Sequence, residues 1–199
     1  MEKKTNNYHI LHVFILFLIY DFILYLYVCI FVPKQMNRTA ASIIKKLKLK
    51  KHPEGGYFSE TYRSPISVGK NQLKKKFSGR RNLSTSIYFL LCGKSFSSFH
   101  KLKADEVWHF YSGVHLNIYI IQKSGRLKKI ILGKNHQYQT VIKAEQWFAA
   151  EVSEPNYFTL AGCTVSPGFD FRDFELGEEE KLVKLYPHLK GLISRLTIK

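Results

Sequence analysis

A histidine and a glutamate in the middle of the chain have the types and the spacing for acid–base or metal chemistry. They are His100 and Glu106, in the segment SFHKLKADEVWHFYSG. An imidazole that titrates near neutral pH can remove a proton next to a carbonyl, and a neighbouring carboxylate can orient that imidazole and raise its basicity. The same side chains are also ligands that non-haem iron or manganese accepts. A third interpretation of His100 is a buried, hydrogen-bonded core histidine.

Further polar and aromatic side chains are candidates for holding a small molecule. The candidate substrate-binding residues are His52, Glu60, Arg63, Ser86, Tyr88, Trp108 and Gln146. Arg63 and the surrounding lysines could hold a phosphate or a carboxylate, although Glu60 and Arg63 could equally pair with each other across a strand. The sequence Glu54-Gly55-Gly56 is interpreted as a tight turn and not as a phosphate cradle, because no helix N-terminus follows it.

The cysteines predict no disulfide. Cys29, Cys92 and Cys163 lie far apart and include no C-x-x-C pair, so this odd, sparse set fits a reducing compartment. Cys92 and Cys163 fall in strand-like segments, where a small buried hydrophobe is the usual role. Cys163 has no base nearby in sequence to activate its thiol, which favours a structural role.

Short strand-like runs separated by turn residues dominate the second half of the chain. One strand is predicted within His52–Ser64, and the others are Thr85–Leu91, Glu106–Tyr111, Leu116–Ile121, Leu127–Leu132, Tyr138–Ile142, Gln146–Ala150 and Tyr157–Val165. Many short strands at a spacing of about 8–12 residues favour a sandwich or a barrel. An amphipathic helix is predicted from Thr39, with Thr39 or Ser42 as its cap, to Leu49. One or two short helices, broken at Pro187, are predicted near the C-terminus.

Four blocks of sequence together resemble one protein family. They are HPEGGYFSETYRS, TSIYFLL, SFHKLKADEVWHFYSG and GCTVSPGFDFRDFEL. The third block resembles the first signature of cupins, with His100, Glu106 and Gly113 at the positions of its first His, its Glu and its Gly. Over nearly all of residues 40–195 the chain resembles cupin family 5, a domain of unknown function also numbered 985. The resemblance implies an all-β fold, a double-stranded β-helix (jelly-roll, cupin) barrel with short flanking helices, usually assembled as a homodimer.

Departures from the metal-binding cupins bear on the cofactor. Leu102 stands where those proteins carry their second His, and Val141–Ala150, which would supply a further His, contains none. His100 and Glu106 alone are too few for a tight metal site unless a side chain of the first strand joins them. We therefore expect no cofactor; if a metal binds, His100 and Glu106 are its expected ligands.

Without a full metal set, the site resembles that of metal-free cupins that epimerise sugar nucleotides, such as dTDP-4-dehydrorhamnose 3,5-epimerase. That resemblance implies His100 as general base, Glu106 or Asp105 as its orienting carboxylate, and Tyr111 or Tyr88 as the residue that returns the proton. The expected function is epimerase- or isomerase-like action on a small anionic, carbonyl-bearing metabolite. The alternatives are a non-catalytic small-molecule-binding module and a metal-dependent oxygenase or isomerase.

The chain is strongly basic, with 31 Lys and Arg against 15 Asp and Glu, a formal net charge of +16. We interpret this charge as a lysine-rich, solvated surface. The basic runs are not interleaved with aromatic residues, and no nucleic-acid-binding signature accompanies them. The expected partners are therefore a small-molecule ligand and a second copy of the chain, with no specific nucleic acid.

The N-terminal residues 1–35 form an apolar extension, and residues 36–199 form the predicted cupin domain. The run Ile10–Val32 is long enough to span a bilayer as a helix, although Asp21 near its midpoint is costly there. Basic residues are denser after this run than before it, so an inserted run would leave the domain facing the cytoplasm. Alternatively, translation starts at Met36. We expect a cytoplasmic domain that contacts a membrane only through residues 10–32.

Overall fold

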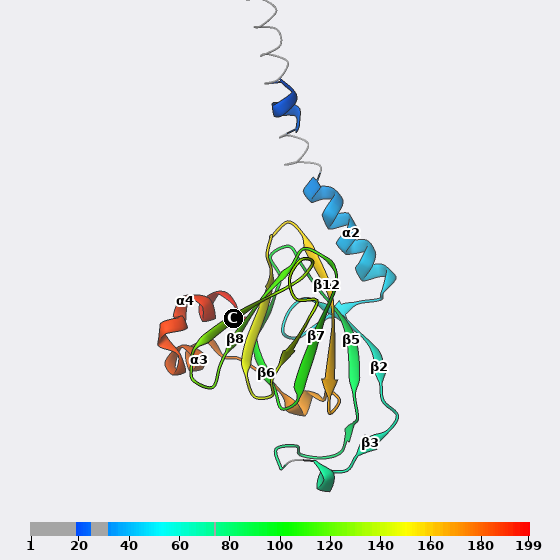
Figure 1. The fold of residues 1–199 in the computed structure, drawn as a ribbon, viewed down its shortest axis with the longest axis vertical. Helices are drawn as coiled ribbons and strands as arrows, with labels where there is room; N and C mark the ends of the chain where they lie inside the picture. The colour runs from blue at the N-terminus through cyan, green and yellow to red at the C-terminus, as the bar shows by residue number, and fades with distance from the viewer. Residues whose placement is uncertain (1–18, 25–31, 74) are drawn as a thin grey trace, which may run out of the picture.

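The strands of this computed structural model, which describes residues 19–24, 32–73 and 75–199, form two facing antiparallel sheets (Figure 1). The larger sheet has the order β1 (Lys50–Lys51), β2 (Tyr57–Arg63), β5 (Thr85–Cys92), β12 (Phe158–Ser166), β7 (Asp105–Gly113) and β10 (Gln139–Ile142). The smaller sheet has the order β13 (Phe174–Leu176), β6 (Phe96–Leu102), β11 (Trp147–Val152), β8 (Leu116–Ile121) and β9 (Leu127–Leu132). β3 (Ser67–Val68) and β4 (Arg81–Asn82) form a separate pair.

Short helices cover the outer surfaces of the two sheets. The helical segments are α2 (Val32–Lys46), η2 (Lys70–Gln72), η3 (Phe171–Asp173), α3 (Glu179–Leu185), η4 (Pro187–Leu189) and α4 (Lys190–Arg195). α2 packs through Ala40 against Leu90 and Phe158 on the larger sheet. α3 and α4 lie beside the smaller sheet, where Leu182 and Ile193 pack in one cluster with other buried side chains (Figure 1).

The main core lies between the sheets and follows from strand alternation. Every second side chain of a strand points inward, so each sheet contributes one apolar face. Phe89 and Trp108 of the larger sheet and Ile118 and Phe148 of the smaller sheet are fully buried in one cluster. This arrangement confirms the predicted all-β jelly-roll sandwich with short flanking helices.

The strands predicted between Thr85 and Val165 are all present, each end lying within two residues of its expected place. β6, which carries His100, was not among them. Its residues FSSFHKL show no apolar–polar alternation, because Ser97, Ser98 and His100 are buried polar residues. Such a strand does not produce the period-2 pattern that identifies a half-buried strand in a sequence.

The helix predicted from Thr39 to Leu49 is displaced toward the N-terminus. α2 begins at Val32 and ends at Lys46, so Thr39 and Ser42 lie inside the helix and do not cap its start. The Ser42 hydroxyl instead donates to the Thr39 carbonyl at 2.8 Å. The C-terminal prediction is confirmed, because the helix α3 ends before Pro187 and α4 follows.

The predicted membrane span lies mostly outside the described residues. Of the run Ile10–Val32, residues 19–24 are described, and they are helical and exposed. Within residues 19–24, 32–73 and 75–199, no helix has both the length and the apolar character that crossing a bilayer requires.

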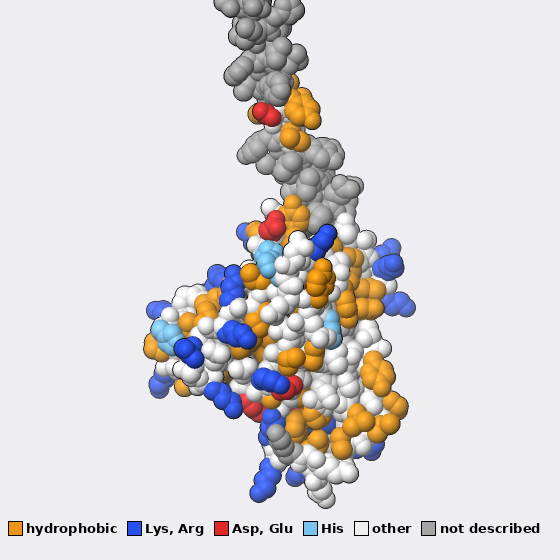
Figure 2. All heavy atoms as spheres, in the orientation of Figure 1, with side chains coloured by type: hydrophobic (Ala, Val, Ile, Leu, Met, Phe, Trp, Pro, Cys, Tyr) orange, Lys and Arg blue, Asp and Glu red, His pale blue; other side chains and the backbone are white. Residues whose placement is uncertain are grey.

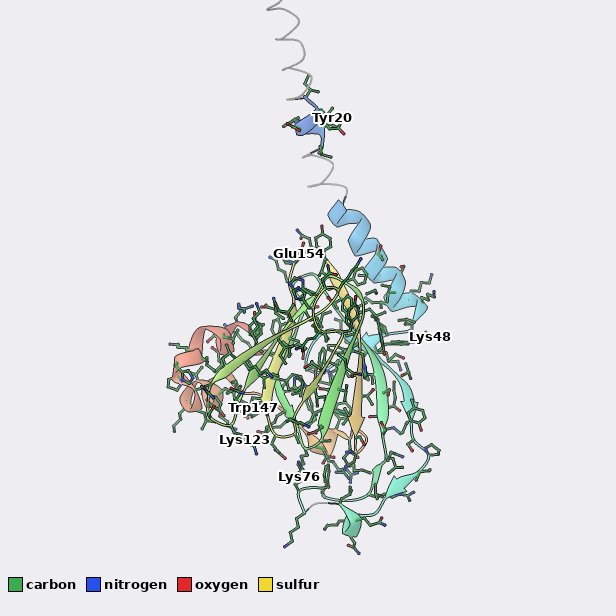
Figure 3. The ribbon with its side chains drawn as sticks, viewed as in Figure 1. Tyr20, Lys48, Lys76, Lys123, Trp147 and Glu154 are labelled. Atoms are coloured by element: carbon green, nitrogen blue, oxygen red, sulfur yellow. The ribbon has the colours of Figure 1, made fainter. Side chains whose placement is uncertain are left out.

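The positive charge of the chain is spread over the domain surface. Lys and Arg side chains stand over most parts of the face seen in Figure 2, with few acidic side chains between them. Lys48, Lys76 and Lys123 lie at separate places around the domain (Figure 3). The basic residues therefore do not gather into one patch on this face.

Candidate functional site

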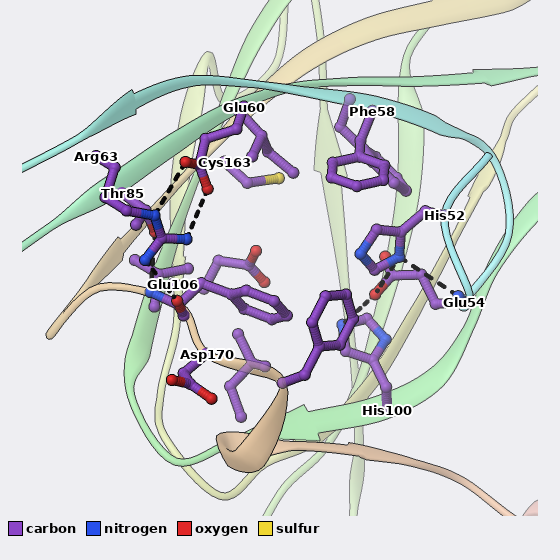
Figure 4. Close-up of a pocket in the computed structure, with 16 residues that line it drawn as sticks. His52, Glu54, Phe58, Glu60, Arg63, Thr85, His100, Glu106, Cys163 and Asp170 are labelled. Atoms are coloured by element: carbon purple, nitrogen blue, oxygen red, sulfur yellow. Dashed lines mark hydrogen bonds and ion pairs between the residues drawn. The ribbon is translucent and has the colours of Figure 1, made fainter. Parts of the chain in front are cut away.

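A cavity of about 380 Å³ lies inside the sandwich (Figure 4). Its wall comes from the turn after β1, from β2, β5, β6, β7 and β12, and from the segment between β12 and η3. The lining residues are His52, Glu54, Phe58, Glu60, Arg63, Thr85, Ile87, Phe89, His100, Leu102, Glu106, Cys163, Val165, Phe169, Asp170 and Phe171. The lining is therefore mixed, with apolar side chains and ionisable His, Glu, Asp and Arg side chains in equal number.

Strand alternation explains which side chains reach the cavity. On β5, Thr85, Ile87 and Phe89 line it, whereas Ser86 and Tyr88 point to the other side of the sheet. On β6, His100 and Leu102 line the cavity, and on β7 Glu106 does so. The same alternation that builds the core thus carries the ionisable groups inward.

A glycine pair lets the turn before β2 press against β6. Gly55 and Gly56 have φ of +108° and +67°, conformations that side chains rarely adopt. A Cβ at Gly55 would lie 2.1 Å from the carbonyl oxygen of Phe96, so only glycine permits this approach. The turn is held there by the backbone N–H of Ser98, which donates to the Glu54 carbonyl at 2.8 Å. As a result, the side chain of Glu54 is buried beside β6.

The Glu54 carboxyl lies between two imidazoles. Its Oε2 is 3.4 Å from His52 Nδ1 and 3.3 Å from His100 Nε2. Its Oε1 accepts from the Ser97 hydroxyl at 2.9 Å. His100 Nδ1 lies 2.7 Å from the carbonyl oxygen of Ser98, and because a carbonyl can only accept, that nitrogen carries a hydrogen. In a neutral His100, Nε2 therefore presents a lone pair to Glu54.

The pKa shifts agree with a neutral network. Burial raises the pKa of Glu54 and lowers the pKa values of His52 and His100. A protonated Glu54 can donate from Oε2 to His100 Nε2. His52 Nδ1 accepts from the backbone N–H of Glu54 at 3.4 Å, which leaves the hydrogen of a neutral His52 on Nε2. None of the described residues hydrogen-bonds that Nε2, which faces the cavity (Figure 4).

Glu106 occupies the other side of the cavity and is fully buried. Its Oε2 accepts from the indole N–H of Trp108 at 2.9 Å, and the thiol of Cys163 is hydrogen-bonded to the same carboxyl. Burial raises the pKa of Glu106 to about 7; the nearby His100 and the hydrogen bonds from Trp108 and Cys163 oppose this rise, and the Glu54 carboxyl adds to it. The Glu106 carboxyl thus titrates in the range that suits a general base or acid at neutral pH.

Ion pairs stand at the more exposed end of the cavity. Arg63 donates to both carboxylate oxygens of Glu60, at 2.9 and 2.6 Å. Asp170 accepts from the guanidinium of Arg172 at 2.9 and 2.6 Å, which holds the pKa of that carboxyl below its usual range. The Glu60–Arg63 pair expected from the sequence is therefore formed, and both partners also line the cavity.

The structure gathers some of the sequence-predicted site residues and separates others. His52, Glu60, Arg63, His100 and Glu106 share the cavity wall. The remaining predicted site residues, which lie outside that wall, are Ser86, Tyr88, Trp108, Tyr111 and Gln146.

Each residue outside the wall has another environment. Tyr111 is 52% exposed and packs edge-on against Tyr88, with the ring centroids 5.9 Å apart. Ser86 is hydrogen-bonded to Thr164 at 3.1 Å. Asp105, the alternative partner for His100, instead accepts from the backbone N–H of Ala144 at 2.8 Å. The geometry therefore gives Tyr111 and Asp105 no direct contact with a molecule in the cavity.

The sequence analysis missed Glu54, which connects the two histidines. The turn prediction around it is correct, but that interpretation assigned no role to the carboxyl. The sequence feature that could have identified Glu54 is its position. It lies directly before a glycine pair, in a block whose first residue is a histidine. Phe58 and Phe89 were likewise missed, because no feature of the sequence separates a phenylalanine of a cavity wall from one of a core.

The described residues do not fit a metal site of the kind that metal-binding cupins use. Leu102 lines the cavity two residues after His100 and offers no ligand atom. Phe148 packs on the His100 ring, with the centroids 4.1 Å apart, in the stretch that would have supplied a later His. Within the described ranges, no group of three His, Cys, Asp or Glu side chains is arranged to hold a metal ion. No catalytic step is therefore assigned to a metal here.

Known proteins are similar to this chain in fold, and the residues matched by a family model include the four sequence blocks described above. The chain is 33% identical over 156 residues to the uncharacterized protein YML079W of Saccharomyces cerevisiae, covering 69% of this chain and 76% of that protein. A hypothetical protein from Leishmania major has a TM-score of 0.72 and 31% identity, over 80% of this chain and 99% of its own. A Shewanella oneidensis protein has a TM-score of 0.71 and 37% identity, over 79% of this chain and 96% of its own. A family model described as Cupin superfamily (DUF985) matches residues 41–177, and the chain belongs to this family.

Proposed function

We propose that this cupin domain is an isomerase that moves a proton on a small carbonyl compound bound in the cavity. In this proposal Glu106 is the general base, and His52 donates a hydrogen bond to the carbonyl oxygen. The observation that carries the proposal is a fully buried carboxyl, with its pKa raised to about 7, in the same chamber as an unpaired imidazole N–H. Acid–base catalysis is most effective when the pKa of the catalytic group lies near the working pH.

The chemical steps need no other reagent. The Glu106 carboxylate takes a proton from the carbon next to the carbonyl, and the electron pair of that C–H bond forms the C=C bond of an enolate. The negative charge moves to the oxygen, where the Nε2–H of His52 stabilises it. When the substrate carries a C=C bond beside that carbon, the intermediate is a dienolate, and Glu106, now protonated, returns the proton to the far carbon of the dienolate. Atoms and charge balance, and the product is an isomer of the substrate.

The geometry favours Glu106 over His100 as the base. Both ring nitrogens of His100 are engaged, Nδ1 with the Ser98 carbonyl and Nε2 with Glu54. A base needs a free lone pair within reach of the substrate proton. His100 therefore acts as a positioning residue, because it holds Glu54, and Glu54 in turn orients His52.

Deuterium exchange tests this proposal without knowledge of the substrate. The full chain would be incubated in D₂O with a panel of neutral ketones, keto acids and keto sugars, and loss of the proton next to each carbonyl followed by ¹H NMR. We expect exchange of at least one compound, reduced about 10²–10⁴-fold in Glu106→Gln, the range general-base catalysis supplies. The exchange rate should rise with pH, with a midpoint of about 7, because the carboxylate is the active form.

The matched control is Glu154→Gln, which changes an exposed glutamate at a loop tip far from the cavity (Figure 3). It should exchange as the unchanged chain does. Exchange that survives Glu106→Gln would refute the role of Glu106. A compound that saturates the cavity with no exchange in the whole panel would refute the isomerase proposal and support a non-catalytic binding module.

A further inference from the structure

The cavity lining contains more acidic than basic side chains, whereas the chain as a whole is basic. The chain carries a formal net charge of +16, whereas four carboxyl side chains line the cavity against a single Lys or Arg, which is Arg63. The lysines visible on the surface in Figure 2 are absent from the lining. An anionic ligand inside the cavity would therefore depend on Arg63 for a fixed positive charge.

Four of the five N–H groups of Arg63 already donate to protein acceptors. Its Nε and Nη2 donate to the two carboxylate oxygens of Glu60. Its Nη1 donates to Asn82 Oδ1 at 3.1 Å and to the carbonyl oxygen of Phe169 at 3.2 Å. The guanidinium fork that would bind a carboxylate or phosphate in the bidentate manner is thus occupied. Glu60 also neutralises its charge.

Among the residues that the structure describes, the cavity lining contains no other Lys or Arg to pair with an anion. His52 and His100 have lowered pKa values because of burial, so both are neutral at pH 7 in the network described above. Glu106 is the group there that ionises near neutral pH, and its charge is negative. An entering carboxylate would add a negative charge to a chamber whose lining already holds four carboxyl groups, and buried unpaired charges are strongly disfavoured.

Shape and wall chemistry point to a small ring. Liquid water occupies about 30 Å³ per molecule, so about 380 Å³ holds on the order of a dozen water-sized groups. Phenylalanines on several sides offer flat apolar surfaces, and Phe171 lies parallel to His52 with the centroids 6.2 Å apart. A planar ring can pack against Phe171 or Phe58 while its oxygen reaches His52.

We propose that the cavity takes uncharged, ring-sized carbonyl compounds and rejects carboxylates and phosphates. This proposal rests on the function proposed above and narrows its substrate class. It departs from the anionic metabolite expected from the sequence, because the arginine expected to hold the anion is paired with Glu60. In this proposal the cavity disfavours anions because Arg63 is paired with Glu60. Removing that pairing should therefore weaken the preference for uncharged compounds.

A matched pair of probes tests the selection. The probes are the methyl ester of 4-oxocyclohexanecarboxylic acid, which is neutral, and the free acid, which is an anion at neutral pH. Their dissociation constants for the full chain would be measured by ligand-observed NMR. We expect the ester to bind at least about tenfold more tightly than the anion. In Glu60→Gln, which removes the negative charge paired with Arg63, that ratio should fall at least about tenfold.

Two controls keep this result specific. The double variant Glu60→Gln/Arg63→Gln should restore the preference for the ester, because the released cation is gone. Glu154→Gln should leave the ratio unchanged. The Glu60–Arg63 pair is partly exposed, with 40% and 39% of the two side chains accessible, and such pairs add little to stability. Loss of the fold is therefore not the expected effect of either substitution.

Three outcomes would overturn the proposal. They are equal or tighter binding of the anion to the unchanged chain, no binding of either probe, and a preference that Glu60→Gln does not alter. Failure of the substrate class is distinguishable from failure of the function. If a keto acid exchanges deuterium and this exchange depends on Glu106, the result would support the proposed isomerase and refute the proposed selection against anions.

Discussion

The substitution Glu106→Gln should make the protein more stable at alkaline pH. The pKa of Glu106 is about 7 in the folded chain against an ordinary value of 4.5. Because the folded state binds this proton more tightly, the favourable contribution is present below pH 4.5 and is lost as the pH rises through about 7. At about 1.36 kcal/mol per pKa unit, the loss amounts to about 3 kcal/mol. Glutamine keeps an acceptor for Trp108 and cannot ionise, so the variant should escape this loss.

Urea denaturation followed by tryptophan fluorescence measures the effect, since Trp108 is fully buried. The difference in the free energy of unfolding between Glu106→Gln and the unchanged chain should shift by about 3 kcal/mol in favour of the variant between pH 4 and pH 8. Other titrating groups are common to both proteins and largely cancel in this difference. Glu154→Gln, an exposed control, should show no such shift. Parallel curves for Glu106→Gln and the unchanged chain would refute the buried, shifted carboxyl on which the proposed function depends.

Three further substitutions probe the supports of the cavity. Asp173→Ala should cost about 3–5 kcal/mol in urea denaturation, because it leaves the buried Arg81 guanidinium unpaired; a cost near zero would contradict the role of that pair. Gly55→Ala should lower stability by about 3 kcal/mol, because a Cβ there meets a backbone oxygen at 2.1 Å; an unchanged melting temperature would contradict the close approach. Leu102→His should raise the zinc or nickel content of the purified chain in elemental analysis, because it adds an imidazole to the cavity wall two residues after His100; unchanged content would show that ligand number is not limiting.

The fold was predictable because it depends on local patterns that survive in one sequence. Short runs such as Leu116–Ile121 and Leu127–Leu132 combine strand-forming residues with turn residues on either side, and the structure reproduces those bounds. The cupin-like blocks added the expectation that these strands form a jelly roll. β6 escaped the pattern because its inward residues include serines and a histidine, which are buried only by virtue of partners elsewhere in the chain.

The sequence predicted which residues belong to the site better than it predicted the role of each residue. The resemblance to the first cupin signature identified His100 and Glu106 as site residues, and both line the cavity. The importance of Glu54 could not be inferred, since its burial depends on a turn pressed against β6 by the hydrogen bond from Ser98. Contacts between segments more than 40 residues apart, such as that of Glu54 with Ser97, leave no trace in local periodicity.

Burial, more than residue type, decides which group in this cavity can act as the base. A histidine is the usual general base at neutral pH, and a glutamate is the usual orienting partner. Here desolvation moves the two in opposite directions, raising the pKa of Glu106 and lowering that of His100. The same burial leaves His100 hydrogen-bonded at Nδ1 and in contact with Glu54 at Nε2. In the proposed function the Glu106 carboxyl is therefore the base, in place of the His100 imidazole that the epimerase resemblance implied.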